Sequence, residues 1–251
     1  MATEEPKRLF DFAYYALKNH PRPDALNTKV KGEWHSLSTQ EYIDKAESLA
    51  RGLIELGVQP GDKIAIISTN NRTEWNICDQ AILSVGAIDV PVYPTITPED
   101  YEFIFNDAEV KYCFLSDEDL FKKVDAIKGK VPSLKNIYSF EPIKGCDSWD
   151  NVFMSAKEKN QKELTSRMKV VKPEELATLI YTSGTTGTPK GVMLSHNNIT
   201  QNALAASERL PVDPVAKGLS FLPLCHSYER VLVYVYMKTG VGTYYAESLE
   251  T

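Results

Sequence analysis

A loop rich in glycine and hydroxyl side chains occupies residues 181–191, where the sequence reads YTSGTTGTPKG. Its glycines, Gly184, Gly187 and Gly191, permit close approach of the backbone to a ligand, and successive N–H groups in such a loop can form a nest for phosphate oxygens. Four side chains add hydroxyl donors, those of Thr182, Ser183, Thr185 and Thr186. Lys190 supplies a positive charge, and a hydroxyl can complete the oxygen shell of Mg²⁺. We predict a phosphate-binding loop, with a flexible connection of no function as the alternative.

The best-known phosphate-binding motifs do not fit this loop. In a P-loop, GxxxxGK[ST], the lysine follows glycine, precedes serine or threonine, and leads directly into a helix. Here Lys190 follows Pro189 and precedes Gly191, and the next residues have the apolar character of a strand. A Rossmann GxGxxG motif is also absent. The loop is therefore predicted to join two strands.

His226 is the second candidate for chemistry, within the stretch LPLCHSYER at residues 222–230. A lone histidine is more often structural, and Cys225 is a poor partner for it, because neighbours in sequence rarely face each other. The four cysteines are scattered without a CxxC pair, which is typical of reduced thiols in a cytosolic protein. Glu229 and Arg230 are predicted to form a structural ion pair.

Alternating helix and strand patterns surround both candidates and must position them. Strands are predicted at residues 25–30, 33–37, 63–67, 88–93, 110–115, 136–140, 176–182, 191–195, 219–222 and 242–246. Helices are predicted at residues 9–17, 73–85, 97–107, 119–127, 197–210 and 228–238, with another that begins at Ser38. Nearly continuous apolar runs such as residues 63–67 are typical of buried parallel strands. We predict an α/β fold of doubly wound, mostly parallel sheets with flanking helices.

Local signals mark several helix ends. Ser38 and Glu41 have the spacing of a capping box, Gly57 suits the stop of the same helix, and Thr97-Pro98 suits a helix start. Residues 143–172 are polar and lysine-rich, and we predict one surface helix at 149–159 followed by a connector. This stretch divides the chain into an N-terminal subdomain, 1–172, and a second α/β subdomain, 173–251, that carries the phosphate loop.

Composition excludes some classes of function. The chain has 251 residues, 43% hydrophobic and 25% charged, which is enough for a substantial core. A net charge of −6 argues against a nucleic-acid binder, which needs a basic face. The N-terminus lacks the apolar region of a signal peptide, and no apolar run approaches the ~20 residues of a membrane span. We expect a soluble, cytoplasmic protein, with peripheral membrane contact left open.

The longer stretch at residues 179–196, LIYTSGTTGTPKGVMLSH, resembles the signature of the adenylate-forming, or AMP-binding, enzymes. The stretch at 222–230 is similar to the next motif of that family, and residues 61–66 and 90–95 are similar to its opening domain. The sequences YER at 228–230 and YYAES at 244–248 resemble the long-chain fatty acyl-CoA synthetase branch. The resemblance therefore covers nearly the whole chain and implies the N-terminal part of an acyl-CoA synthetase-like fold.

This resemblance implies a reaction in two steps. A fatty acid attacks ATP to give an acyl-adenylate and pyrophosphate, and the thiol of coenzyme A then displaces AMP. It implies that residues 182–187 and Lys190 hold phosphates, that the Thr185 hydroxyl lies near Mg²⁺, and that His226 borders the acyl carboxylate. Lys190 and His226 are thus the expected catalytic residues. Ser195 and His196 are interpreted as structural residues between strand and helix.

A face of the helix after His226 has two interpretations. The residues of this face repeat at helical spacing. They are Tyr228, Val231, Leu232, Val235 and Tyr236. We predict that they pack in the core, with the lining of an acyl tunnel as the alternative.

The later motifs of the family have no counterpart in this sequence, including those for adenine and ribose, a metal-binding acid and the C-terminal domain. We therefore expect a fragment, inactive alone, whose uncovered apolar surface favours self-association into a homo-oligomer. Two alternatives stay open: another carboxylic acid–CoA ligase of the same superfamily, and a non-catalytic nucleotide-binding module.

Overall fold

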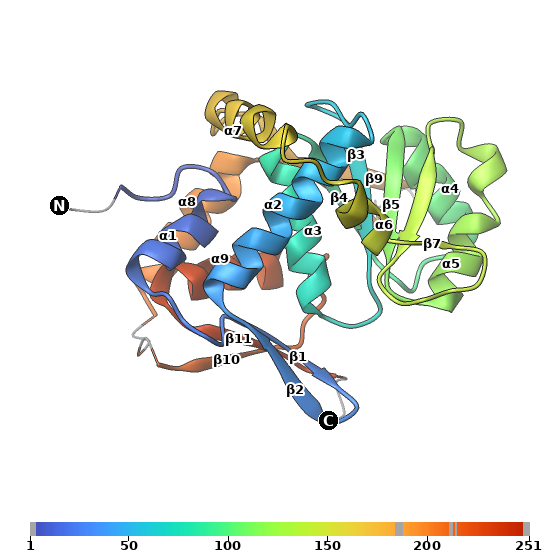
Figure 1. Ribbon diagram of the computed structural model, residues 1–251. Coiled ribbons are helices and arrows are strands. Elements are labelled where there is room, and N and C mark those ends of the chain that lie inside the picture. Colours follow the sequence, from blue (N-terminus) through green and yellow to red (C-terminus); the bar gives the residue numbers. More distant parts are fainter. Residues whose placement is uncertain (1–3, 184–187, 211–212, 214, 248–251) are drawn as a thin grey trace.

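The computed structural model describes residues 4–183, 188–210, 213 and 215–247, and Figure 1 shows two sheets with helices packed on them. The strands are β1 (Leu26–Val30), β2 (Glu33–Leu37), β3 (Lys63–Ile67), β4 (Ile88–Val92), β5 (Val110–Leu115), β6 (Asn136–Ser139), β7 (Asp147–Ser148), β8 (Leu176–Ser183), β9 (Pro189–Ser195), β10 (Lys217–Ser220) and β11 (Gly242–Tyr245). The helices are α1 (Asp11–Asn19), α2 (Thr39–Glu55), α3 (Thr73–Ser84), α4 (Pro98–Asp107), α5 (Glu118–Asp125), the 3₁₀ turn η1 (Lys128–Lys130), α6 (Asp150–Ser155), α7 (Asn160–Val170), α8 (His196–Ser207) and α9 (Ser227–Thr239).

The larger sheet has seven strands in the order β7-β6-β5-β3-β4-β8-β9. All neighbours in it are parallel except β8 and β9, which form an antiparallel hairpin. The smaller sheet has the order β10-β11-β1-β2, with only β1 and β2 antiparallel. The predicted strands at both sides of the phosphate loop are confirmed.

The central strand β3 shows why helices cover both faces of the larger sheet. Side chains alternate along a strand, so Ile64 and Ile66 belong to one buried core and Ala65 and Ile67 to another. The first core contains α2 and α3, and the second contains α4 and α5, which lie on the opposite side of the sheet in Figure 1. The predicted doubly wound α/β fold is confirmed.

Helix ends follow the local signals in the sequence. Ser38 and Glu41 form the predicted capping box of α2, and Gly57 adopts a positive φ of 81° after its last turn. Thr97 caps α4, where Pro98 is the first helical residue. None of the helices formed by the described residues is long and apolar enough to cross a membrane.

The predicted connector before residue 172 is wrong, because most of it is the helix α7. This helix is polar, and its burial depends on Leu164 and on Arg167, whose Nη1 donates to the Val58 carbonyl at 2.7 Å. An arginine anchored to a distant carbonyl leaves no apolar period in the sequence. The division at residue 172 stays a prediction about subdomains. Both sheets contain strands from both sides of it, since β8 pairs with β4 and β11 with β1.

We predict that Gly52→Ala destabilises the fold. A Cβ at Gly52 of α2 would lie 2.1 Å from the backbone oxygen of Val152 in α6, so the two helices would have to separate. Overpacking of this kind costs about 1–3 kcal/mol, which exceeds the helix propensity gained by alanine. The free energy of unfolding in urea measures the loss. Gly129→Ala is the control, because no atom lies within 4 Å of its added Cβ; equal effects of the two substitutions would contradict the close contact.

His196 is structural, as its sequence position predicts, and it gives the fold a pH dependence. It is 1% exposed, and its Nδ1 accepts a hydrogen bond from the Leu9 N–H at 3.3 Å. Burial, with Arg230 and Arg8 nearby, lowers the pKa of His196 to about 4. The neutral ring therefore stabilises the fold above the unfolded pKa of about 6.5.

We predict that this stabilisation disappears as the pH falls from about 6.5 to 4, since the unfolded chain then binds the extra proton. His196→Asn keeps an acceptor but cannot titrate in this range. The difference in unfolding free energy between the parent and this variant should change by a few kcal/mol over the interval. A constant difference from pH 7 to 4 would show that the His196 ring does not titrate with the lowered pKa.

Candidate active site

A cavity of about 660 Å³ lies beyond the carboxyl ends of the parallel strands β4 and β8. Its apolar wall is formed by Pro91, Val92, Ile96, Ile104 and Ile180. Its polar groups come from Tyr93, Asp100, Tyr181, Thr182, His226 and Ser227. Ligands of open α/β sheets bind at this edge, and an apolar cavity with a few convergent polar groups is typical of a binding site. Of the residues predicted from sequence, Thr182 and His226 both line it.

The β8–β9 hairpin holds the described ends of the phosphate loop close together. Thr182 is exposed at the cavity and lies directly across the hairpin from Lys190, which is also exposed. Ser183 pairs with Pro189 one step further along. The predicted residues Gly184, Thr185, Thr186 and Gly187 lie outside the described residues. Phosphate binding by the loop therefore stays a prediction, with its two ends fixed by the hairpin.

Tyr181 fixes the base of this hairpin from inside the molecule. Its hydroxyl donates to Asp107 Oδ2 at 2.5 Å, which joins β8 to the last residue of α4. Burial and this carboxylate raise the pKa of Tyr181, so the phenol remains a donor. Its ring lies against Gly191, where an added Cβ would be only 3.0 Å from Cζ. A side chain at residue 191 would therefore press on the Tyr181 ring.

His226 also lines the cavity, at the N-cap of α9. Its backbone N–H donates to the Pro223 carbonyl at 2.8 Å, and its carbonyl accepts from the Arg230 N–H at 3.2 Å. The imidazole is exposed and meets the Tyr93 ring edge-on, with centroids 6.5 Å apart and an angle of 80°. Within the part of the chain that the structure describes, this imidazole has no hydrogen-bond partner, so it is available to a ligand in the cavity.

The helix that carries His226 is anchored by a buried group of charges. The Nη2 of Arg230 lies 2.5 Å from Asp79 Oδ1 and 3.2 Å from Asp89 Oδ2, and Tyr234 donates to Asp79 Oδ2 at 2.5 Å. These four side chains are all buried. Burial raises the pKa of Asp89, against the lowering effect of Arg230, and Asp79 raises it further. Asp79, which also accepts from Tyr234, is the closer counter-charge of Arg230.

The predicted pair of Glu229 with Arg230 is therefore wrong. The side chains of adjacent residues on a helix point about 100° apart. Arg230 therefore reaches the carboxyl groups of α3 and β4, while the Glu229 side chain is buried away from them. The exposed fraction of Glu229 is 1%, and among the described residues its Oε1 has no hydrogen-bond partner. Burial raises the pKa of this carboxyl group.

The predicted core packing of this α9 face is confirmed only in part, for Val235 in the core and Val231 packed against it. Tyr228 is 59% exposed, and of the five predicted residues only Val235 is buried. The face that packs into the core contains Glu229, Arg230, Val233, Tyr234, Val235 and Met237. The buried charges rotate this face away from the one that apolar spacing alone predicts. The cavity near His226 is instead lined by apolar residues of β4, the following loop, α4 and β8.

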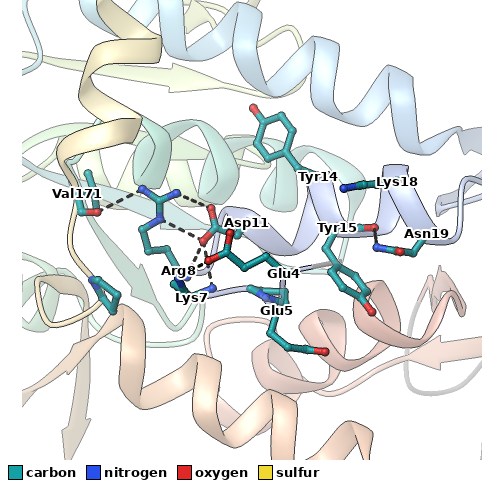
Figure 2. A pocket seen from close by; sticks show the side chains of 12 residues that line it. Glu4, Glu5, Lys7, Arg8, Asp11, Tyr14, Tyr15, Lys18, Asn19 and Val171 are labelled. Atoms are coloured by element: carbon teal, nitrogen blue, oxygen red, sulfur yellow. Dashed lines mark hydrogen bonds and ion pairs between the residues drawn. The ribbon is translucent and has the colours of Figure 1, made fainter. Parts of the chain in front are cut away.

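Another hollow, of about 500 Å³, is formed mainly by the N-terminal segment and α1. Figure 2 shows the side chains of Arg8 and Asp11 pointing toward each other, with Lys7 and Glu4 beside them. Arg8 pairs with Asp11 at 2.8 Å and donates to the Val171 carbonyl at 3.3 Å. These groups are already satisfied within the fold, which favours the cavity at His226 as the functional site.

Sequence reasoning missed Tyr93 and Asp107 as residues of this site. Tyr93 directly follows the buried strand β4, and this position at a carboxyl strand end was a signal that could have identified it. Asp107 acts through Tyr181, from a helix 74 positions away in sequence, and no local pattern marks that contact.

The predicted metal contact concerns the hydroxyl of Thr185. Among the described residues, no group of three or more His, Cys, Asp or Glu side chains has the geometry to hold a metal ion. Thr185, the residue predicted to lie near Mg²⁺, is outside this description. The metal contact stays a prediction for that hydroxyl.

Comparison with known proteins extends over most of the chain. Residues 14–251 match the family described as AMP-binding enzyme. The long-chain-fatty-acid–CoA ligase FadD15 of Mycobacterium tuberculosis is 35% identical over 206 residues, which cover 81% of this chain and 34% of that protein. The long-chain-fatty-acid–CoA ligase ACSBG2 of Xenopus laevis is 31% identical over 233 residues, covering 89% and 31%. This chain thus spans about a third of the length of these curated relatives.

Solved structures share the fold. A long-chain-fatty-acid-CoA ligase, FadD1, from Archaeoglobus fulgidus superposes with a TM-score of 0.82 at 22% identity, covering 98% of this chain and 48% of that one. The anthranilate CoA ligase AuaEII, solved with anthranoyl-AMP, gives a TM-score of 0.80 at 20% identity, covering 94% and 44%. At this level of identity the likeness concerns the fold alone.

We predict that Arg230→Met destabilises the fold by about 3–5 kcal/mol, because it leaves a buried carboxylate without its counter-charge. Thermal and urea unfolding measure the loss. Adding Asp79→Asn to the same chain should recover part of it, since the uncompensated charge is then removed. Arg209→Met, on an exposed arginine in the turn after α8, is the control. Equal effects at the two arginines would contradict the role of the buried charges.

Proposed function

This chain belongs to the AMP-binding enzyme family, and from that premise we propose that the protein of which it forms part is an AMP-forming long-chain fatty acid–CoA ligase. The names of the relatives FadD15 and ACSBG2 support the substrate class. Because the chain spans about a third of these relatives, the activity is proposed for the longer protein. The proposed substrates are a fatty acid, ATP and coenzyme A, with Mg²⁺ as the metal.

One observation carries the proposal: the hairpin with Thr182 and Lys190, and the imidazole of His226, border the same cavity edge of the sheet. Two chemically different parts of a substrate complex would meet there. The polyphosphate of ATP would lie at the loop between β8 and β9, and the acyl carboxylate would lie beside His226. The apolar wall between them suits the first carbons of an alkyl chain.

In the first step, a carboxylate oxygen of the fatty acid attacks the α-phosphorus, and the bond to pyrophosphate breaks. Negative charge then accumulates on the departing oxygens, where the Lys190 ammonium and the N–H groups of the loop would stabilise it. Mg²⁺, when bound, neutralises phosphate oxygens, and the hydroxyl of Thr185 would hold it. The His226 imidazole would orient the carboxylate by a hydrogen bond rather than remove a proton.

In the second step, the sulfur of coenzyme A attacks the carbonyl carbon of the acyl-adenylate. AMP leaves with the electrons of the C–O bond, and the thiol proton passes to solvent or to a base in the remainder of the protein. We also propose that the protein is cytoplasmic and that it associates with itself. The four cysteines are free thiols, which is compatible with a reducing compartment.

We predict that Lys190→Ala in the intact enzyme lowers kcat/KM for ATP roughly 10- to 100-fold, because stabilisation of the leaving pyrophosphate is lost. Pyrophosphate exchange into ATP, dependent on a fatty acid, measures the first step alone. Lys162→Ala, on an exposed lysine of α7, is the matched control. Equal exchange rates for the parent and Lys190→Ala would exclude this role for Lys190.

The acyl substrate is tested separately, with straight-chain acids of increasing length beside acetate and benzoate. Preference for long chains supports the proposal. A preference for acetate or for the aromatic acid would instead identify another carboxylic acid–CoA ligase. Absence of any acid-dependent exchange would favour a nucleotide-binding module without catalysis.

A further inference from the structure

The side chain of Asn71 forms a three-point contact with the segment that leads to His226. Its Nδ2 donates to the Ser220 hydroxyl at 2.9 Å and to the Leu222 carbonyl at 2.7 Å. Its Oδ1 accepts from the Leu224 N–H at 3.1 Å. These bonds join groups 149 to 153 positions apart in sequence. A carboxamide is suited to this task because it combines two donors with an acceptor in one planar group.

The loop that carries Asn71 is itself fixed to the larger sheet. It follows β3, and the Thr69 N–H donates to the Ser116 hydroxyl at 3.0 Å, just beyond β5. The Thr69 hydroxyl also bonds to Asp117, which caps α5. On the other side, the Thr73 N–H donates to the Thr28 hydroxyl of β1 at 2.9 Å. Asn71 therefore extends from the carboxyl edge of the sheet, where the cavity lies.

The segment held by Asn71 has few apolar anchors of its own. Its strand β10 ends at Ser220, and the next two side chains, Phe221 and Leu222, are 50% and 36% exposed. Burial resumes only at Leu224 and Cys225, directly before His226. Hydrogen bonds to Asn71 span this gap between strand and helix, so they determine the path of the backbone into α9.

We propose that Asn71 is a positioning residue, which sets the place of the His226 imidazole on the cavity wall by holding residues 220–224. This inference rests on the proposed function, in which His226 orients the acyl carboxylate. Among the described residues, Asn71 forms its side-chain hydrogen bonds with residues 220–224 and none with the β8–β9 hairpin, so its effect should concern the acid rather than ATP.

The first arm of the test uses the intact enzyme without substrate. Asn71→Asp keeps the size and the acceptor but loses both donors, and it places a negative charge beside the Leu222 carbonyl. Asn106→Asp is the matched control, since Asn106 also donates to two carbonyls, those of Glu102 and Lys130, on an exposed surface. Hydrogen exchange of the peptide containing residues 220–226 should accelerate roughly tenfold or more in Asn71→Asp and stay unchanged in the control. Unchanged exchange in Asn71→Asp overturns the tether.

The second arm measures its consequence in pyrophosphate exchange. Asn71→Asp should lower kcat/KM for the fatty acid roughly 10- to 100-fold while the KM for ATP stays within about twofold. In the His226→Ala background, Asn71→Asp should add little, because the group that it positions is gone. Two results would show that Asn71 has a structural role only and would overturn the proposal. One is that the effects of Asn71→Asp and His226→Ala on kcat/KM are fully additive, and the other is that Asn71→Asp lowers kcat/KM equally for ATP and for the fatty acid. If the parent enzyme activates no fatty acid, the proposed function fails. The hydrogen-exchange measurement of the first arm still decides whether Asn71 holds residues 220–224.

Discussion

The ion group of Arg230 with Asp79 and Asp89 is the constraint that arranges the rest of the site. It joins α9, α3 and β4 in a region without access to water, where charges must be paired and oriented. The strand β4 leads into Tyr93, and α9 begins one residue after His226. The rings of Tyr93 and His226, which meet edge-on in the cavity, therefore project from two elements that the Arg230 guanidinium joins. Because removal of one partner from such a group is costly, the angle between α9 and the sheet has little freedom.

The cavity combines parts from two sheets. The hairpin with Thr182 and Lys190 is the edge of the seven-stranded sheet, whereas the chain reaches His226 from β10 of the four-stranded sheet. Neither sheet contains the whole site. Asn71 is one direct polar link between them at the cavity edge, and the buried charges form a deeper link. The chemistry proposed here thus depends on the relative placement of the sheets as much as on the loop that first indicates nucleotide binding.

Much of the fold could be predicted from sequence because its signals are local. The run Lys63–Ile67 is apolar on both faces, the Ser38 and Thr97 caps involve only the next few residues, and apolar residues mark the strands β8 and β9. The errors concern groups whose partners lie far away in sequence. Polar α7 is held by Arg167 on a distant carbonyl, and the buried face of α9 is set by carboxylates of α3 and β4. Spacing in α9 cannot show that an arginine belongs inside. The contributions of Asn71 and Asp107 to the site are invisible for the same reason.

The hairpin that presents Lys190 also places β9 at the border of its sheet, paired only with β8 among the described strands. Val192 and Met193 on it are 43% and 68% exposed, and a strand border with apolar side chains can template the addition of another strand. Natural proteins often carry a charged side chain at such a border, which opposes pairing with another chain, and Val192 and Met193 carry none.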